Sequence, residues 1–262
     1  MARSDVLDIR LFASDLDGTL LGNRESSARF MRCWTALDPA TRPILVYNTG
    51  RSLESTRALV ESGALPPPDY IIGGVGTELC DCRYSVDPSF LRRFSHGWNL
   101  ARIESLLAAL PGIERQPPEF LHPYKSSWFW PDATSGDIEH LRQTLADAGM
   151  QVTVIYSASR YLDVLPAAAD KGKALKWLCD RLAIPMTNVL VAGDTGNDTS
   201  MLALPWVKRI LVSNALPELL ADTVGLAKFQ ASRPMADGVI EGLQHFSVIA
   251  TARRLFYSSR PI

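Results

Sequence analysis

The N-terminal part of the chain alternates between short apolar runs and segments with helical periodicity. Strands are predicted over 9–14, 44–47 and 70–72, because each run is mainly apolar and ends in polar or glycine residues. Between these runs, 25–37 and 53–62 space their apolar residues as amphipathic helices do. Strands that are apolar on both faces and alternate with helices are typical of a parallel sheet covered by helices. We therefore predict an α/β fold.

The middle of the chain has a different pattern, in which helices and strands do not alternate one by one. Its predicted elements are helix 100–110, strand 125–130, helix 138–148, strand 151–156 and strand 160–165. This order indicates a small α+β module. We predict that the module occupies 82–166 and is inserted between two parts of one α/β domain, 1–81 and 167–262.

The alternating pattern resumes after the predicted insertion. Its elements are helix 170–182, strand 189–192, a helix that begins at Met201 and Leu202, strand 209–212 and helix 236–246. The strands are again apolar on both faces, so this part is predicted to complete the first sheet.

Two carboxylates, Asp15 and Asp17, follow the first predicted strand and precede Gly18 and Thr19. In an extended chain, residues two apart project to the same side. Neighbouring carboxylates repel, so one of them takes a proton or a cation lies between them. Oxygen ligands are those that Mg²⁺ prefers. Taken alone, the same residues also suit an Asx-type turn.

Further polar residues follow other predicted strands or open a predicted helix. Carboxyl ends of parallel strands meet at one edge of a sheet, where ligands collect. Each segment alone has an ordinary explanation as a helix cap, a solvated lysine or a turn. Together they favour phosphoryl transfer to a carboxylate. The anionic carboxylate and an anionic phosphate about 4 Å apart repel by roughly 4 kcal/mol. A metal cation and a lysine are therefore needed to let the carboxylate approach the phosphate. These residues are Thr49, Gly50, Arg51, Lys171, Asp194 and Asp198.

Composition narrows the choice of partners and compartment. The chain has 262 residues, 47% hydrophobic and 21% charged, which is enough apolar material for a folded core. Its formal net charge is −1 and no basic block is present, so no nucleic-acid partner is expected. No apolar run is long enough for a membrane span or a secretion signal. Four scattered cysteines without a Cys/His cluster indicate free thiols in a reducing, cytoplasmic setting.

The chain resembles haloacid-dehalogenase (HAD)-like phosphatases over its whole length. Four segments match the superfamily motifs: Asp-Leu-Asp-Gly-Thr-Leu at 15–20, Thr-Gly-Arg at 49–51, the segment around Lys171, and Gly-Asp-Thr-Gly-Asn-Asp at 193–198. The place of the insertion resembles the Cof-type, C2B-capped branch. The resemblance implies a HAD-like Rossmannoid core, with a parallel β-sheet flanked by helices, and an inserted α+β C2B-type cap that sets substrate specificity.

Within that branch, the chain looks most like sucrose-phosphate phosphatases. The supporting segments are 47–52, 74–78, 162–166, 170–172 and 213–219. The implied activity is Mg²⁺-dependent hydrolysis of a sugar phosphate, in the first place sucrose 6-phosphate, through an aspartyl phosphate. Phosphatases of mannosylfructose phosphate, glucosylglycerol phosphate or a monosaccharide phosphate stay open as alternatives. So do a phosphomannomutase-type phosphotransferase and a non-catalytic sugar-phosphate sensor.

The resemblance also implies roles for single residues. Asp15 is the nucleophile, Asp17 the general acid and base, and Lys171 the cation that neutralises phosphate and nucleophile. Mg²⁺ is bound by Asp15, the backbone carbonyl of Asp17 and Asp194, while Asp198 orients Lys171. The residues assigned to the substrate are Thr49, Gly50, Arg51 and Asn197 in the core, and Lys125 and Asp163 in the cap.

Two further expectations concern the cap and the assembly. Trp128, Phe129 and Trp130 offer a sugar-stacking platform, but alternating aromatic residues in a strand more often form the core of a small sheet, which is our prediction. The protein is expected to be a monomer or weak dimer that acts on a small sugar phosphate. An association with a sugar-phosphate synthase stays open.

Overall fold

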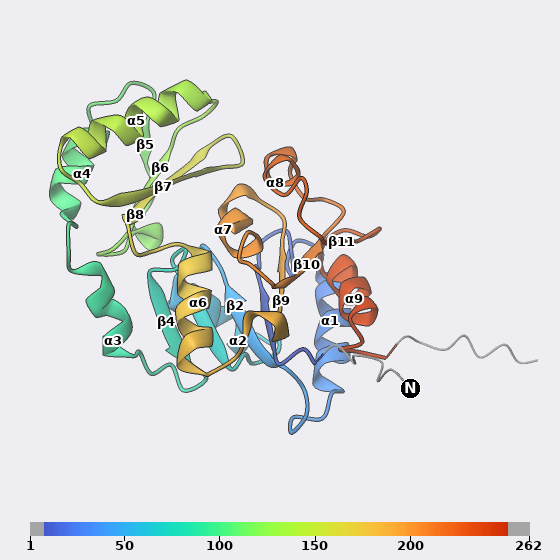
Figure 1. The fold of residues 1–262 in the computed structure, drawn as a ribbon. Helices are drawn as coiled ribbons and strands as arrows, with labels where there is room; N and C mark the ends of the chain where they lie inside the picture. Colours follow the sequence, from blue (N-terminus) through green and yellow to red (C-terminus); the bar gives the residue numbers. More distant parts are fainter. Residues whose placement is uncertain (1–7, 251–262) are drawn as a thin grey trace, which may run out of the picture.

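The computed structural model describes residues 8–250, which build two β-sheets with helices packed on them (Figure 1). The larger sheet has seven strands in the order β11-β10-β9-β1-β2-β3-β4. All its pairs are parallel except β3 with β4. The predicted α/β class is therefore confirmed. The strands are β1 (Leu11–Ser14), β2 (Ile44–Asn48), β3 (Tyr70–Gly73), β4 (Glu78–Asp81), β9 (Val189–Gly193), β10 (Lys208–Leu211) and β11 (Phe229–Gln230).

Helices cover both faces of the larger sheet, because its central strands are apolar on both sides. Along β1, Leu11 and Ala13 pack into one hydrophobic cluster and Phe12 into the other. The cluster that contains Phe12 includes side chains of α1 (Arg24–Thr35), α2 (Leu53–Glu61) and α9 (Met235–His245). The opposite cluster includes side chains of α3 (Pro88–Leu91), α6 (Lys171–Arg181), α7 (Thr199–Leu202) and α8 (Pro217–Asp222).

The smaller sheet is antiparallel and has the strand order β5-β6-β8-β7. Its strands are β5 (Glu114–Arg115), β6 (Ser126–Phe129), β7 (Val152–Ser157) and β8 (Tyr161–Pro166). A separate apolar cluster joins this sheet to α4 (Leu100–Leu107) and α5 (Ser135–Asp147). Figure 1 shows this unit beside the larger sheet, with the β7–β8 hairpin reaching toward α8. Single turns of 3-10 helix are η1 (Arg92–Phe94), η2 (Pro118–Phe120), η3 (Met186–Asn188) and η4 (Gly196–Asp198).

Several local predictions were wrong or incomplete. Met201 and Leu202 end the short helix α7 instead of beginning a helix. Pro205 follows closely and disfavours helical conformation in the residue before it. The antiparallel strand β4 was not predicted, since it follows a glycine-rich turn and is four residues long. Strands β5 and β11 have two residues each, too few for a periodic pattern.

The structure also bears on the expectations about cysteines and membranes. All four cysteines are free thiols. Among residues 8–250, no helix has the length and apolar character that a membrane crossing requires.

Candidate active site

The predicted catalytic residues meet at the carboxyl ends of three neighbouring strands. Strand β1 pairs in register with β2 on one side and β9 on the other, so the three strands end at one level. Asp15 follows β1, Thr49 follows β2 and Asp194 follows β9. Helix α6 brings Lys171 to the same edge as its first residue, with the Asp170 side chain accepting a hydrogen bond from the Lys173 N–H as the N-cap.

Lys171 is the centre of this group, and its side chain is completely buried. Its Nζ donates hydrogen bonds to Asp15 Oδ1 at 2.6 Å, Asp198 Oδ1 at 2.7 Å and Asn197 Oδ1 at 2.8 Å. Burial by itself would lower the pKa of Lys171, but the carboxylates of Asp15 and Asp198 raise it above its ordinary value. The ammonium group is therefore a permanent positive charge beneath Asp15.

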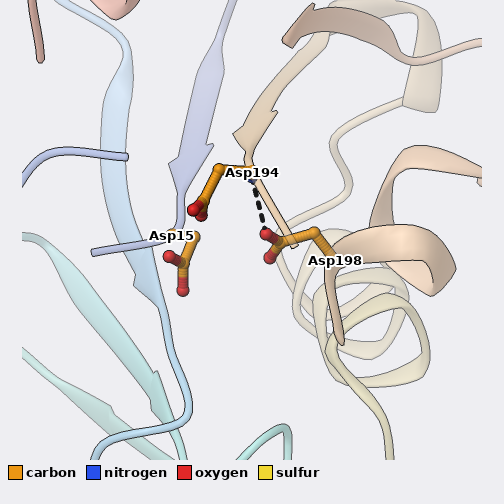
Figure 2. Close-up of side chains that lie close together, drawn as sticks. All are labelled: Asp15, Asp194 and Asp198. Carbon is orange, nitrogen blue, oxygen red and sulfur yellow. Dashed lines mark hydrogen bonds between the residues drawn. The ribbon is translucent and has the colours of Figure 1, made fainter. Parts of the chain in front are cut away.

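Three buried carboxylates surround this single lysine. Asp15, Asp194 and Asp198 each offer one oxygen, and these oxygens lie within 4.8 Å of one another (Figure 2). Burial raises the pKa of Asp15 to about 7, although Lys171 opposes the shift. Burial, and then repulsion from Asp15 and Asp198, raises the pKa of Asp194 to about 8. One ammonium group does not balance these charges, so the cluster favours a further cation.

The donors of the cluster fit a hard divalent cation. Both oxygens of Asp198 are engaged: Oδ1 by Lys171, and Oδ2 by the N–H of Asp194 at 2.9 Å. Asp194 Oδ1 accepts from the Thr19 hydroxyl at 2.9 Å, while Oδ2 faces Gly18. A Cβ on Gly18, whose φ is +82°, would lie 2.1 Å from Oδ2. Glycine at this position thus leaves room for the Asp194 carboxylate itself, and carboxylate oxygens are ligands that Mg²⁺ prefers.

Asp17 lines the same cavity as Asp15, but it does not belong to the cluster of three buried carboxylates. Strand β1 ends at Ser14, and the chain then turns, with the N–H groups of Thr19 and Leu20 bonded to the Leu16 carbonyl. The alternation of an extended strand therefore stops before Asp17. Its half-exposed carboxylate accepts two hydrogen bonds from Arg51, at 2.6 and 2.7 Å.

A cavity of about 340 Å³ lies between this edge and the smaller sheet. Two residues of the smaller unit line it: Asp163, in strand β8, and Lys125, directly before strand β6. The Lys125 side chain is almost completely buried, and its Nζ lies 3.4 Å from the Gly50 carbonyl oxygen. Asp163 accepts a hydrogen bond of 2.6 Å from the Ser127 hydroxyl. The predicted site residues that line the cavity are Asp15, Asp17, Gly50, Arg51, Lys125, Asp163 and Asn197.

Thr49 is buried and does not line this cavity. Its hydroxyl oxygen accepts a hydrogen bond of 3.2 Å from the Arg51 N–H. In this structure Thr49 therefore supports the turn that presents Gly50 and Arg51.

The aromatic residues of β6 divide between core and cavity. Trp128 packs in the core of the smaller sheet, as predicted, and Trp130 packs against the same core. Phe129 instead lines the cavity with Phe120 and Tyr161, so the prediction was wrong for this residue. Period-two alternation separates neighbours in a strand, but the sequence does not say which face is covered. Other lining residues that sequence reasoning missed are Gln116, Ser157, Ala158 and Thr195.

The fold and this site define a HAD-like hydrolase. A HAD subclass IIB sugar phosphatase has the same fold, with a TM-score of 0.67 and 15% identity, covering 92% of this chain and 100% of that one. The model of the sucrose-6F-phosphate phosphohydrolase family matches residues 9–247, and the chain belongs to that family. The protein is therefore a hydrolase of the sugar-phosphatase type, as the resemblance predicted.

Individual relatives differ in the substrate that their names give. Mannosylfructose-phosphate phosphatase of Agrobacterium fabrum is 40% identical over 246 residues, which are 92% of this chain and 98% of the relative. The structure of the sucrose-phosphatase from Synechocystis, a complex with sucrose and phosphate, has a TM-score of 0.84 and 28% identity, covering 93% of this chain and 99% of that one. Probable sucrose-phosphatase 2 of Arabidopsis thaliana is 31% identical over 255 residues, which are 91% of this chain but only 60% of the relative.

Proposed function

We propose that this protein is a Mg²⁺-dependent phosphatase of a disaccharide phosphate, with sucrose 6-phosphate as substrate. The observation that carries the proposal is the buried Lys171, which joins Asp15 to Asp198 beside Asp194, with Asp15 itself lining the cavity. The opposite wall, with Lys125, Asp163 and aromatic side chains, suits the hydroxyls and the apolar faces of sugar rings. Mannosylfructose phosphate is the second candidate, because that phosphatase relative is 40% identical over nearly its full length.

The proposed reaction gives each carboxylate the role that the resemblance to HAD-like phosphatases implies. An oxygen of Asp15 attacks phosphorus, the bond to the sugar oxygen breaks, and Asp17 gives that oxygen a proton. Water then attacks the aspartyl phosphate, Asp17 takes its proton, and Asp15 is released. Lys171 holds Asp15 in place and balances its charge throughout. Mg²⁺, held by Asp15, Asp194 and the backbone carbonyl of Asp17, supplies neutralisation of the phosphate charge.

Arg51 gives Asp17 two states in this proposal. Its guanidinium donates a hydrogen bond to each carboxylate oxygen of Asp17. A phosphate group is an equally good bidentate partner for arginine, and both residues line the cavity. We infer that the arriving phosphate takes over Arg51 and releases Asp17 for proton transfer.

The proposed substrate is tested by measuring phosphate release from a panel of sugar phosphates. The panel contains sucrose 6-phosphate, mannosylfructose phosphate, glucosylglycerol phosphate and glucose 6-phosphate. We expect the highest kcat/KM for sucrose 6-phosphate. A higher value for another compound would replace the substrate and keep the reaction, whereas an isomerised sugar phosphate without free phosphate would indicate a mutase.

Metal binding is expected to depend on pH. In the folded protein without metal, the pKa of Asp15 is raised to about 7 and that of Asp194 to about 8. In the unfolded chain both carboxyl groups have the ordinary pKa of 3.8. Above about pH 4, the folded protein therefore holds protons that the unfolded chain has lost. Stability without metal therefore falls as pH rises from about 4 to about 8. Mg²⁺ must displace these protons, so at pH values below these two pKa values its apparent affinity rises about tenfold per pH unit for each displaced proton.

Thermal unfolding with EDTA or with Mg²⁺ at pH 6, 7 and 8 measures this effect. The stabilisation by Mg²⁺ should grow with pH and vanish in Asp194→Asn. An equal stabilisation at all three pH values would contradict the proposed ligands.

Two broader expectations stay predictions. Four free thiols suit a reducing, cytoplasmic compartment. We expect a monomer or weak dimer, which size-exclusion chromatography of the protein alone tests. The same measurement on a mixture with a sugar-phosphate synthase tests the association with such an enzyme.

A further inference from the structure

We infer that Glu218 is a positioning residue that clasps the β7–β8 hairpin of the smaller sheet against the loop after β9. The inference rests on the proposed function, because it explains how the sugar-contacting wall is held over the phosphate site. Glu218 belongs to α8 and does not line the cavity, so it acts through the residues that it holds.

One carboxylate oxygen makes the connection. Glu218 Oε1 accepts a hydrogen bond of 2.9 Å from the N–H of Gly196 and another of 2.9 Å from the N–H of Ala158. Gly196 lies in the loop that carries Asp194 and Asp198, whereas Ala158 lies at the turn between β7 and β8. Figure 1 shows α8 next to the end of this hairpin. The two walls of the cavity are thus joined through one side chain.

The hairpin turn has a conformation that its own residues disfavour. Ala158 and Ser159 have φ values of +51° and +49°, in the left-handed region that residues other than Gly, Asn and Asp rarely adopt. An acceptor outside the hairpin therefore helps to hold the turn. Ser157 and Tyr161, which flank the turn, line the cavity. The position of the turn consequently decides where these two side chains meet a sugar.

On the side of the larger sheet, Gly196 lies close against the Glu218 carboxylate. A Cβ on Gly196 would lie 2.9 Å from Glu218 Oε1, so a larger residue would push the carboxylate away. The neighbouring N–H of Thr195 donates to Asp198 Oδ2 at 3.2 Å, and Asp198 in turn holds Lys171. Hydrogen bonds, joined through the backbone of Thr195, thus connect the lysine of the phosphate site to the hairpin. On another side of the cavity, Lys125 approaches the Gly50 carbonyl at 3.4 Å.

The test uses three variants and one matched control. Glu218→Ala removes the acceptor, Glu218→Asp shortens it, and Glu218→Gln keeps a neutral oxygen in its place. Asp222→Ala is the control, since Asp222 lies on the same helix but accepts its hydrogen bond from Thr199 of the core, at 2.9 Å. Each protein is assayed with sucrose 6-phosphate and with p-nitrophenyl phosphate, which has no sugar ring. Hydrogen–deuterium exchange of the 157–161 peptide reports the hairpin without any substrate.

We expect Glu218→Ala to lower kcat/KM for sucrose 6-phosphate about tenfold. Two hydrogen bonds are lost, and the one to the hairpin, from the Ala158 N–H to a charged acceptor, holds the sugar-contacting wall. The loss should appear mainly in KM, hydrolysis of p-nitrophenyl phosphate should change less than twofold, and exchange at 157–161 should increase. Glu218→Gln should restore most of both properties, Glu218→Asp should be intermediate, and Asp222→Ala should match the wild type.

Two outcomes would overturn the clasp. The first is wild-type exchange and wild-type sugar-phosphate kinetics in Glu218→Ala. The second is an equal loss on both substrates, which would show that Glu218 merely supports the core loop. Failure of the proposed function is distinguishable, because the exchange measurement needs no turnover and Asp15→Asn independently tests the reaction.

Discussion

Asp15→Asn is expected to lower the rate of phosphate release from sucrose 6-phosphate by about 10⁴-fold or more. Losses of this size are usual when the proposed nucleophile is removed from a set of catalytic residues that act together. The amide has the shape of the carboxylate, but it does not attack phosphorus. It also withdraws one charged oxygen from the proposed Mg²⁺ ligands. The residual rate is measured as steady-state phosphate release, at a higher enzyme concentration than the wild-type assay uses.

The same substitution should leave the fold intact. It removes one of three buried carboxylates that repel one another, and the amide oxygen still accepts from Lys171. We therefore expect a metal-free melting temperature at or above that of the wild type. Asp38→Asn, in an exposed turn where Asp38 accepts from the Ala40 N–H, is the control and should keep full activity. Substantial turnover by Asp15→Asn would refute the assignment of the nucleophile.

Lys171→Met is expected to abolish activity and to destabilise the protein by about 3–5 kcal/mol, the typical cost of removing one partner of a buried ion pair. The methionine fills the volume but leaves Asp15 and Asp198 without their buried cation. Urea unfolding in EDTA measures the free energy of unfolding. Lys173→Met is the matched control, because its half-exposed ion pair with Asp170 contributes at most about 1 kcal/mol.

The destabilisation by Lys171→Met should grow as pH rises through about 7 to about 8, where Asp15 and Asp194 of the wild type lose their protons. Protonated carboxyl groups need no cation, whereas the ionised forms of Asp15 and Asp194 repel without it. Adding Asp15→Asn should recover part of the loss, since one of the repelling charges is then removed. A Lys171→Met protein as stable as the wild type at pH 8 would contradict the role of Lys171 as the buried counter-charge.

How far a site can be predicted depends on whether its parts are local in the chain. The strands β1, β2 and β9 were predicted because their apolar runs end abruptly, and residues after parallel strands converge at one edge. Asp15, Lys171 and Asp194 therefore came together as expected, before any side-chain distance was known. Short elements such as β5 and β11 escaped, because two residues carry no periodic signal.

The sequence by itself determined the α/β class, the order of the motifs and the residues that gather around the buried lysine, because all of these follow from local patterns and strand ends. Only the tertiary structure decided that Arg51 holds Asp17, that Phe129 lines the cavity while Trp128 is buried, and that Glu218 joins the hairpin to the core. These contacts depend on where a turn leaves its strand and on which surface covers each face. Neither property is encoded in the spacing of residues along the chain.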